Sequence, residues 1–276
     1  MVCILFPKFF QPLPAGELAQ RIHALGFDGV DILVRDDYWV TTETIRKDLP
    51  EFVRIMHDFG LSTTSATTDL LDVEDPRLES SLAAMADQGV RQFRLRHLPY
   101  RGLGTLHKDV DAARRTLLRL EGLCEKHGLR CFVQTHGGTL HPSASATYSL
   151  VQGLDPSYVG VHFDPANMIY QDGHEAWQLG VDLLGPYICM VGVKNAGVYR
   201  DDSDVRRGPA WRREWTTLES GLVDWCEVLG LLRAAGYGGP LCMHNFYEMD
   251  LASLTEQTRR DLEHLRALLG MQSSGE

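Results

Sequence analysis

Short apolar runs alternate with longer amphipathic segments along almost the whole chain. Eight runs are typical of buried β-strands: Val2–Phe6, Gly29–Val34, Ser62–Ala66, Gln92–Arg96, Arg130–Thr135, Tyr158–Phe163, Ile188–Lys194 and Pro240–Asn245. Between and after them, apolar residues recur at helical spacing over Ala15–Leu25, Thr42–Phe59, Pro76–Gln88, Lys108–His127, Ala144–Gly153, Gly173–Gly185, Gly221–Ala235 and Leu251–Leu269. This alternation predicts parallel strands joined by helices.

Glycines mark the joints between the predicted helices and strands. "ALGFDGVDI", "DQGVRQFRL" and "KHGLRCFVQ" each end a helix at a glycine and begin a strand soon after it, as a left-handed helix cap would. Eight units in 276 residues average about 34 residues, near the size of a βα unit. The pattern predicts a single-domain α/β (β/α)8 TIM barrel over residues 1–270, with a flexible tail at 271–276. A doubly wound open sheet is the alternative, although no GxGxxG follows the first strand.

Composition and charge exclude several kinds of partner. The chain is 44% hydrophobic and carries a formal net charge of −10, so counterion release would not favour binding to nucleic acid. No run approaches about 18 apolar residues, and we expect no membrane span. The amino terminus lacks a basic leader and is interpreted as the first strand. Six cysteines without a CxxC pair indicate free thiols in a reducing cytoplasm.

Polar side chains gather where the predicted strands end. In a barrel these ends meet at one face, which is the face that carries function. Each residue taken alone is also compatible with a hydrogen-bonded core or loop position. The last four strands together favour a site built from Gln134, His136, His162, Asp164, Asn167, Lys194, His244 and Glu248, and the earlier strand ends add Lys8, Trp39 and His97.

Four stretches resemble the xylose isomerase-like barrels, a superfamily of sugar and sugar-phosphate isomerases and epimerases. They are "ALGFDGVDI", "FDPANM", "VKN" and "SGLVDWCEVLGLLRAAGYGGPL", and the resemblance extends over nearly the whole chain. It implies a divalent metal at the ends of strands 5 to 8, held by Glu, Asp, His and Glu. It also implies that the two glutamates move a proton next to the substrate carbonyl.

The metal ligands implied by the resemblance are mostly changed in this chain. Gln134 stands for the first Glu, Gly192 for the His and His244 for the second Glu, whereas Asp164 is retained. Such a set would hold Mg²⁺ poorly. The metal ligands predicted here are Asp164, His244 and Gln134, with His162 or His136 completing a set suited to Mn, Zn or Fe. A protein without metal is the alternative, and Gly192, Gln134 and the net charge disfavour DNA repair of the endonuclease IV type.

The predicted function is that of a sugar or sugar-phosphate isomerase or epimerase that transfers a proton next to a carbonyl. The predicted catalytic residues are His136, His244, Lys194 and Gln134, and the predicted substrate-binding residues are Asn167, His97, Trp39 and Glu248. Two alternatives stay open: a metal-free lyase or dehydratase that uses His and Lys groups, and a barrel that only binds carbohydrate. The expected partner is a carbohydrate, sugar acid or sugar phosphate, and by analogy a second copy of the chain in a homodimer.

The stretch 195–218 is predicted to be a long loop that is rich in arginine. Its arginines are Arg200, Arg206, Arg207, Arg212 and Arg213. One interpretation is a solvated loop. The other is a lid whose guanidinium groups bind a phosphate or carboxylate of the substrate.

Overall fold

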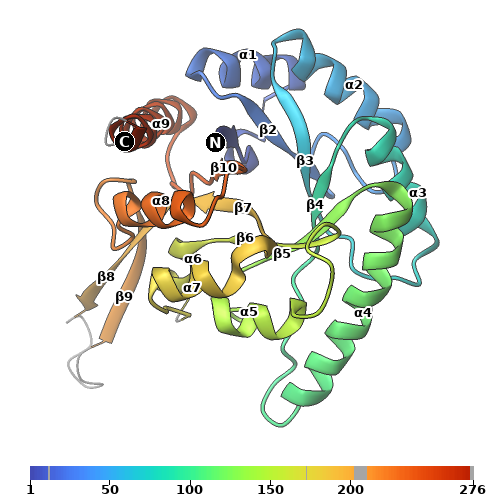
Figure 1. Cartoon of the computed structure of the whole chain (residues 1–276). Helices are drawn as coiled ribbons and strands as arrows, with labels where there is room; N and C mark the ends of the chain where they lie inside the picture. The colour runs from blue at the N-terminus through green and yellow to red at the C-terminus, as the bar shows by residue number, and fades with distance from the viewer. Residues whose placement is uncertain (12, 172, 202–209, 274–276) are drawn as a thin grey trace.

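The strands close into one barrel, as a computed structural model of the protein shows (Figure 1). The structure describes residues 1–11, 13–171, 173–201 and 210–273. All pairs around the ring are parallel, in the order β1-β10-β7-β6-β5-β4-β3-β2. The predicted (β/α)8 barrel is confirmed. Its strands are β1 (Val2–Leu5), β2 (Gly29–Val34), β3 (Ser62–Thr68), β4 (Gln92–Arg94), β5 (Arg130–Gln134), β6 (Val159–Phe163), β7 (Ile188–Val193) and β10 (Pro240–Met243).

Helices surround this ring of strands (Figure 1). Each predicted helix is present, with ends that shift by a few residues. The helices are α1 (Ala15–Leu25), α2 (Ile45–Asp58), α3 (Pro76–Asp87), α4 (Leu106–His127), α5 (Ala144–Val151), α6 (Pro165–Tyr170), α7 (Trp177–Leu184), α8 (Trp225–Ala234) and α9 (Leu251–Ser273), with short 3-10 turns η1 (Lys8–Phe10) and η2 (Gly185–Tyr187).

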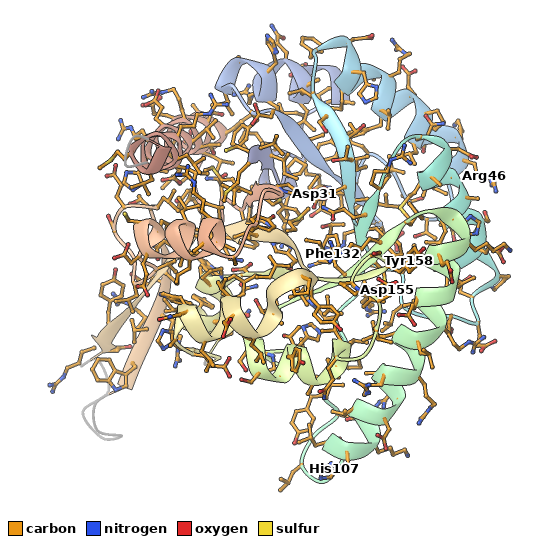
Figure 2. The ribbon with its side chains drawn as sticks, in the orientation of Figure 1. Asp31, Arg46, His107, Phe132, Asp155 and Tyr158 are labelled. Carbon is orange, nitrogen blue, oxygen red and sulfur yellow. The ribbon has the colours of Figure 1, made fainter. Side chains whose placement is uncertain are left out.

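The strands are apolar because both of their faces are covered. β2, β6 and β7 are buried along their whole length, as expected for parallel strands between a barrel interior and a helical shell. A small cluster that includes Ile4, Leu33, Phe132 and Met190 packs apart from the main core. Figure 2 shows Phe132 and Asp31 within the ring of strands. This inner packing makes the barrel a closed support for the side chains at its mouth.

The predicted glycine joints adopt the expected backbone. Gly26 ends α1 with a φ of 89° and Gly128 ends α4 with a φ of 65°. Both values lie in the left-handed region, which glycine enters without the steric penalty of a side chain. These two caps let the chain turn from helix to strand within a few residues.

The structure departs from the sequence-based expectation in three places. Residues 195–218 contain an antiparallel hairpin of β8 (Asn195–Asp201) and β9 (Ala210–Thr216) instead of a loop, which agrees with their aromatic and β-branched residues. Helix α6 follows β6 directly and was not predicted. Helix α9 continues to Ser273, so residues 271–273 of the predicted tail are helical. Arg206 and Arg207 lie outside the described residues.

The cysteines and the helices agree with two further expectations. All six cysteines are free thiols, and Cys226 is the exposed one among them. Within the described part of the chain, no helix combines the length and apolar character that a membrane crossing needs.

Candidate active site

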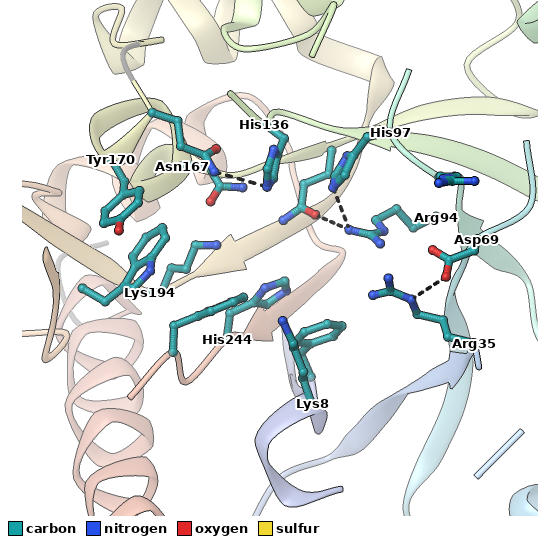
Figure 3. A pocket seen from close by; sticks show the side chains of 16 residues that line it. Lys8, Arg35, Asp69, Arg94, His97, His136, Asn167, Tyr170, Lys194 and His244 are labelled. Carbon is teal, nitrogen blue, oxygen red and sulfur yellow. Dashed lines mark hydrogen bonds and ion pairs between the residues drawn. The ribbon is translucent and has the colours of Figure 1, made fainter. Parts of the chain in front are cut away.

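A cavity of about 460 Å³ opens among the side chains at the carboxyl ends of the strands. Figure 3 shows it from close by. This is the face at which the sequence predicted a site. It is lined by Phe6, Lys8, Arg35, Asp69, Arg94, Arg96, His97, Gln134, His136, Asn167, Tyr170, Gln171, Lys194, Trp215, His244 and Phe246.

A second cavity of about 740 Å³ adjoins the first and shares Arg35, Asp69, Arg96 and His97 with it. Its remaining charged groups are mostly surface carboxylates, among them Asp36. The first cavity differs because buried ionisable side chains form its floor. We therefore describe the first cavity as the candidate active site.

Asp164 is a buried carboxylate beneath the cavity, and both of its oxygens accept hydrogen bonds or contact a cation. Oδ1 accepts a hydrogen bond from the backbone N–H of Asn167 at 2.9 Å and so caps helix α6. Oδ2 accepts from Nε2 of Gln134 at 2.7 Å and lies 3.0 Å from Nζ of Lys194. The carboxylate therefore positions a helix with one oxygen and a cationic side chain with the other.

Lys194 follows β7 and places its ammonium group against the cavity. Besides Asp164, the ammonium faces the rings of Trp215 and Phe246, whose centroids lie 4.6 and 4.5 Å from Nζ. Burial lowers the pKa of Lys194, although the Asp164 carboxylate opposes that change. The result is an ammonium held in a fixed place, with its cost of desolvation offset by one carboxylate and two aromatic faces.

Gln134 links Asp164 to a second buried cation. Its Nε2 donates to Asp164, and its Oε1 accepts from a guanidinium nitrogen of Arg94 at 2.9 Å. An amide can make both contacts at once because it carries a donor and an acceptor. A glutamate here would set a second carboxylate against Asp164, so the amide suits this arrangement better than the family's acid.

Gly192 of β7 stands where the resemblance implies a histidine, and the structure leaves no room for a side chain there. A Cβ atom at Gly192 would lie 2.7 Å from Oδ2 of Asp164 and 2.8 Å from Nε2 of His162. Both distances are shorter than nonbonded carbon contacts allow. The close approach of these two side chains therefore requires glycine.

His162 and His244 are buried imidazoles beside this carboxylate. Their ring centroids lie 5.3 Å apart in an edge-to-face arrangement, and His244 also stacks on Phe6 at 4.4 Å. Within the described residues neither ring nitrogen of either histidine has a hydrogen-bond partner. Burial, together with the charges of Lys194 and Arg94, lowers both pKa values well below the usual range. Both rings are therefore neutral at pH 7.

His136 is held at the opposite side of the cavity by contacts that define its tautomer. Its Nδ1 lies 2.8 Å from the carbonyl oxygen of Gly137 and donates to it, while Nε2 lies 3.2 Å from Nε2 of Gln171 and accepts. Burial lowers the pKa of His136, and the bond to Gly137 opposes that change. The ring of His97 lies against His136, with centroids 4.1 Å apart.

His141, a residue that the sequence did not single out, supports the end of β5 from behind. Its Nε2 accepts from the backbone N–H of Leu98 at 3.1 Å, so Nδ1 carries the proton and donates to the carbonyl of Gln134 at 2.6 Å. Burial lowers the pKa of His141 to about 3. This neutral ring fixes the backbone that presents Gln134.

The structure brings most of the predicted site residues together. Seven of them line the cavity, namely Lys8, His136, His244, Lys194, Gln134, Asn167 and His97, while Asp164 and His162 lie beneath it. Trp39 lies outside the cavity because its indole N–H donates to the carbonyl of Leu13 at 2.8 Å and its ring packs on Phe52. Glu248 also lies outside, on an exposed stretch after β10.

Sequence reasoning missed several residues of the site. Arg94 is buried inside the barrel at the end of β4, a strand of three residues that is too short to mark it by alternation. Trp215 reaches the cavity from the hairpin and stacks on Tyr170 of α6 at 4.0 Å. Phe246 follows His244 by two residues, which is the period-two signal of side chains that share one face of an extended segment.

The donor groups, as they are arranged, do not fit a divalent metal. Asp164 is the one carboxylate at the implied ligand positions, and its Oδ2 already faces the ammonium of Lys194 and the amide of Gln134. In the part of the chain that the structure describes, no group of three or more His, Cys, Asp or Glu side chains is placed to hold a metal ion. Binding of Mn, Zn or Fe stays a prediction of the sequence.

Solved structures of low sequence identity share this fold. One is a xylose isomerase-like TIM barrel protein from Mycobacterium smegmatis in complex with magnesium, with 18% identity, 97% of each chain covered and a TM-score of 0.68. Another is the 3-keto-D-glucoside 4-epimerase of E. coli, with 17% identity over 97% of this chain and 99% of that chain, and a TM-score of 0.72. The probable 3-DHS dehydratase of Bacillus anthracis has 15% identity over 96% of this chain and 99% of that chain, and a TM-score of 0.72.

The family assignment depends on the sequence itself. None of the curated proteins compared with the chain matches it. At the identities given above, the solved structures establish the fold alone. Residues 19–268, however, match the family described as the xylose isomerase-like TIM barrel. With most of its length matched and its eight strands closed in the expected order, the chain belongs to the xylose isomerase-like TIM barrel family.

Proposed function

We propose that the protein is an isomerase or epimerase of sugar-like carbonyl compounds, and that it moves a proton next to the carbonyl without a divalent metal. The observation that carries this proposal is the 3.0 Å contact between Nζ of Lys194 and Oδ2 of Asp164. The ammonium lies on the carboxylate that the family resemblance assigns to the metal. It can donate a hydrogen bond to a carbonyl oxygen and stabilise the negative charge that develops there.

Two neutral imidazoles are the candidate bases of this proposal, and the ammonium of Lys194 is its candidate acid. In Figure 3, His136 and His244 lie on opposite sides of the pocket. They follow β5 and β10, which are separated in the ring by β6 and β7. A neutral imidazole can accept a proton from a carbon next to a carbonyl. The imidazolium formed in this way can return the proton to the neighbouring carbon, which is the step of an isomerase. Inversion of the same carbon needs a proton from the other side, which the ammonium of Lys194 can donate.

The other lining residues suit a hydroxylated substrate. Trp215, Tyr170 and Phe246 present aromatic faces on which the C–H face of a sugar can pack. The amide N–H of Asn167 donates to the carbonyl of Thr135 at 2.9 Å, which fixes the side chain. Its Oδ1 has no donor among the described residues and can accept from a substrate hydroxyl.

The test measures proton exchange and does not require the product to be known. Protein treated with EDTA is incubated in D₂O with a panel of ketoses, aldoses and sugar acids, and deuterium incorporation next to the carbonyl is followed by NMR. We expect exchange to persist after chelation. Lys194→Met and His244→Ala should lower it by about 100-fold to 10,000-fold, whereas Lys108→Met, at an exposed position of α4, should leave it unchanged.

Each contrary result has a definite meaning. Activity that appears only when Mn²⁺, Zn²⁺ or Fe²⁺ is added back would contradict the metal-free mechanism. An unsaturated product would assign the protein to the lyases, because elimination begins with the same proton removal and Lys194 could protonate the leaving hydroxyl. Binding of a sugar without exchange under every condition would contradict catalysis and leave a carbohydrate-binding barrel.

A further inference from the structure

Besides Lys194, the cationic side chains that line the cavity include three whose charges act on one another. Lys8 comes from the turn after β1, Arg35 follows β2 and Arg94 ends β4. All three line the cavity, and we call them the cationic cluster. In Figure 3, Arg35 and Lys194 lie at opposite ends of the pocket.

The members of the cationic cluster are close enough for their charges to interact. Burial lowers the pKa of Lys8, and the charges of Arg35 and Arg94 lower it further. Burial also lowers the pKa of Arg94, with the charge of Arg35 as the next cause. Like charges repel at this range because the cavity wall screens them less than bulk water does. An anion among the three groups would remove that repulsion.

The protein's own acids leave part of this charge unbalanced. Nε of Arg35 lies 3.0 Å from Oδ2 of Asp69, which balances one cation. Nε of Arg94 is buried without a partner and its Nη1 is bonded to the neutral amide of Gln134, while the charges of Asp31 and Asp69 act on this guanidinium without a direct ion pair. The ammonium of Lys8 lies 5.4 and 5.5 Å from the ring centroids of Phe9 and Phe246 and, in the described chain, contacts no carboxylate. The cationic cluster therefore offers donors and excess positive charge to a ligand.

We propose that the cationic cluster binds an anionic group of the substrate, a carboxylate or a phosphate, while the reacting carbon lies beside Lys194, His136 and His244. Ammonium and guanidinium groups both suit such oxygens. This inference rests on the proposed function and narrows its substrate class to sugar acids or sugar phosphates. It also moves anion recognition from the hairpin to the barrel, since the described hairpin residue Arg212 is exposed and paired with Glu214 at 2.7 Å.

Lys8→Gln is the informative substitution. Lys8 makes no ion pair within the described chain, so its loss leaves no carboxylate without a partner. Arg35→Gln would free Asp69 and is a second variant. Lys108→Gln is the matched control, because Lys108 is exposed on α4 and outside the cavity.

The experiment measures binding of inorganic phosphate, D-gluconate and neutral D-glucose by calorimetry, without turnover. We expect phosphate or gluconate to bind to the parent and to the control variant, and Lys8→Gln to weaken that binding about tenfold or more. Preference for phosphate over gluconate would indicate sugar phosphates, and the reverse would indicate sugar acids. Glucose binding should be the same in all variants.

The failure of this inference differs from the failure of the proposed function. If neither anion binds, or if Lys8→Gln and Arg35→Gln bind them as the parent does, the cationic cluster is not an anion site even where proton exchange is observed. If Lys8→Gln loses anion binding but no substrate exchanges, the anion site stands and the proposed catalysis fails.

Discussion

Two aspartates are buried inside this barrel, and their surroundings differ in charge. Asp31 on β2 accepts hydrogen bonds from the hydroxyls of Ser65 and Thr67, at 2.8 and 2.6 Å. Asp164 after β6 faces an ammonium and an amide. Asp31 joins β2 to β3 through neutral donors and does not line the cavity, whereas Asp164 holds the group that faces it.

The comparison separates a carboxyl that only joins two strands from one that holds a cation at the candidate site. Burial raises the pKa of Asp31, and its hydroxyl partners and the more distant charge of Arg94 only partly oppose that change. A carboxyl in such a place is tolerated because it can take up a proton. Asp164 contacts a cation directly, so its charge has a partner within 3.0 Å. Burial alone therefore does not indicate which acid belongs to the site; the charge of the partner does.

The largest effect should come from breaking the ion pair at Asp164. Lys194→Met leaves a buried carboxylate without its cation, and we expect the free energy of unfolding to fall by about 3–5 kcal/mol. Urea denaturation measures this change. The double variant Asp164→Leu/Lys194→Met should recover most of the stability but no activity. Equal stability of the single variant and the parent would contradict a stabilising pair.

The next largest loss of stability should come from substitution of Gly192, which lies against Asp164 and His162. Gly192→Ala places a Cβ against Asp164 and His162, and we expect a loss of about 1–3 kcal/mol in unfolding free energy. Thermal unfolding measures it. Gly122→Ala in α4, where a Cβ meets nothing within 4 Å, is the control and should stabilise the fold by up to about 1 kcal/mol. A Gly192→Ala variant as stable as the parent would argue against the close approach.

Substitution of the other aspartate should have a smaller effect. Asp31→Asn keeps an acceptor and a donor for the two hydroxyls, so we expect a change within about 1 kcal/mol at pH 7. Because the pKa of Asp31 is raised, its contribution to stability is full below the unfolded-state pKa of about 3.9. That contribution is lost as pH rises through the folded-state pKa. The variant should lack this decline, which denaturation between pH 4 and 7 would detect.

The smallest effect is expected in the pH dependence of catalysis. The pKa values of His136 and His244 are lowered by burial from 6.5, so the acid limb of kcat/KM should lie below that pH. The pKa of Lys194 is lowered by burial from 10.5, which brings the alkaline limb below that value. Between pH 6.5 and 8 we expect less than about a twofold change. An acid limb centred above pH 6.5 would contradict neutral imidazole bases.

The fold could be predicted from sequence because its signals are local. Apolar runs, helical spacing and glycine joints such as Gly26 and Gly128 each act within a few residues, and eight repeats of the same signal indicate a closed barrel. The hairpin was not predicted because arginine-rich segments such as Trp211–Arg213 are equally compatible with a solvated loop. Its strands depend on pairing with each other, which the spacing within either segment does not contain.

The site was only partly predictable, for a different physical reason. Gln134, Asp164, Lys194 and His244 could be predicted because each lies at the end of a predicted strand, and position along a strand is a local property. That Lys194 contacts Asp164 depends on the distance between neighbouring strands, which no spacing within either strand contains. Arg94 was missed for a related reason: β4 is three residues long, so alternation along it gives little indication of which side chains point inward.

The crowding around Gly192 constrains how this site can change over generations. Reversion of Gln134 to Glu would oppose two carboxylates, and reversion of Gly192 to His would meet Asp164 and His162. Replacement of His244 by Glu would place an acid in a stack with Phe6. Each of these changes alone meets a barrier, so the ligand set that the resemblance implies could be built here only by several simultaneous substitutions. The effects of these substitutions are therefore expected to be strongly non-additive.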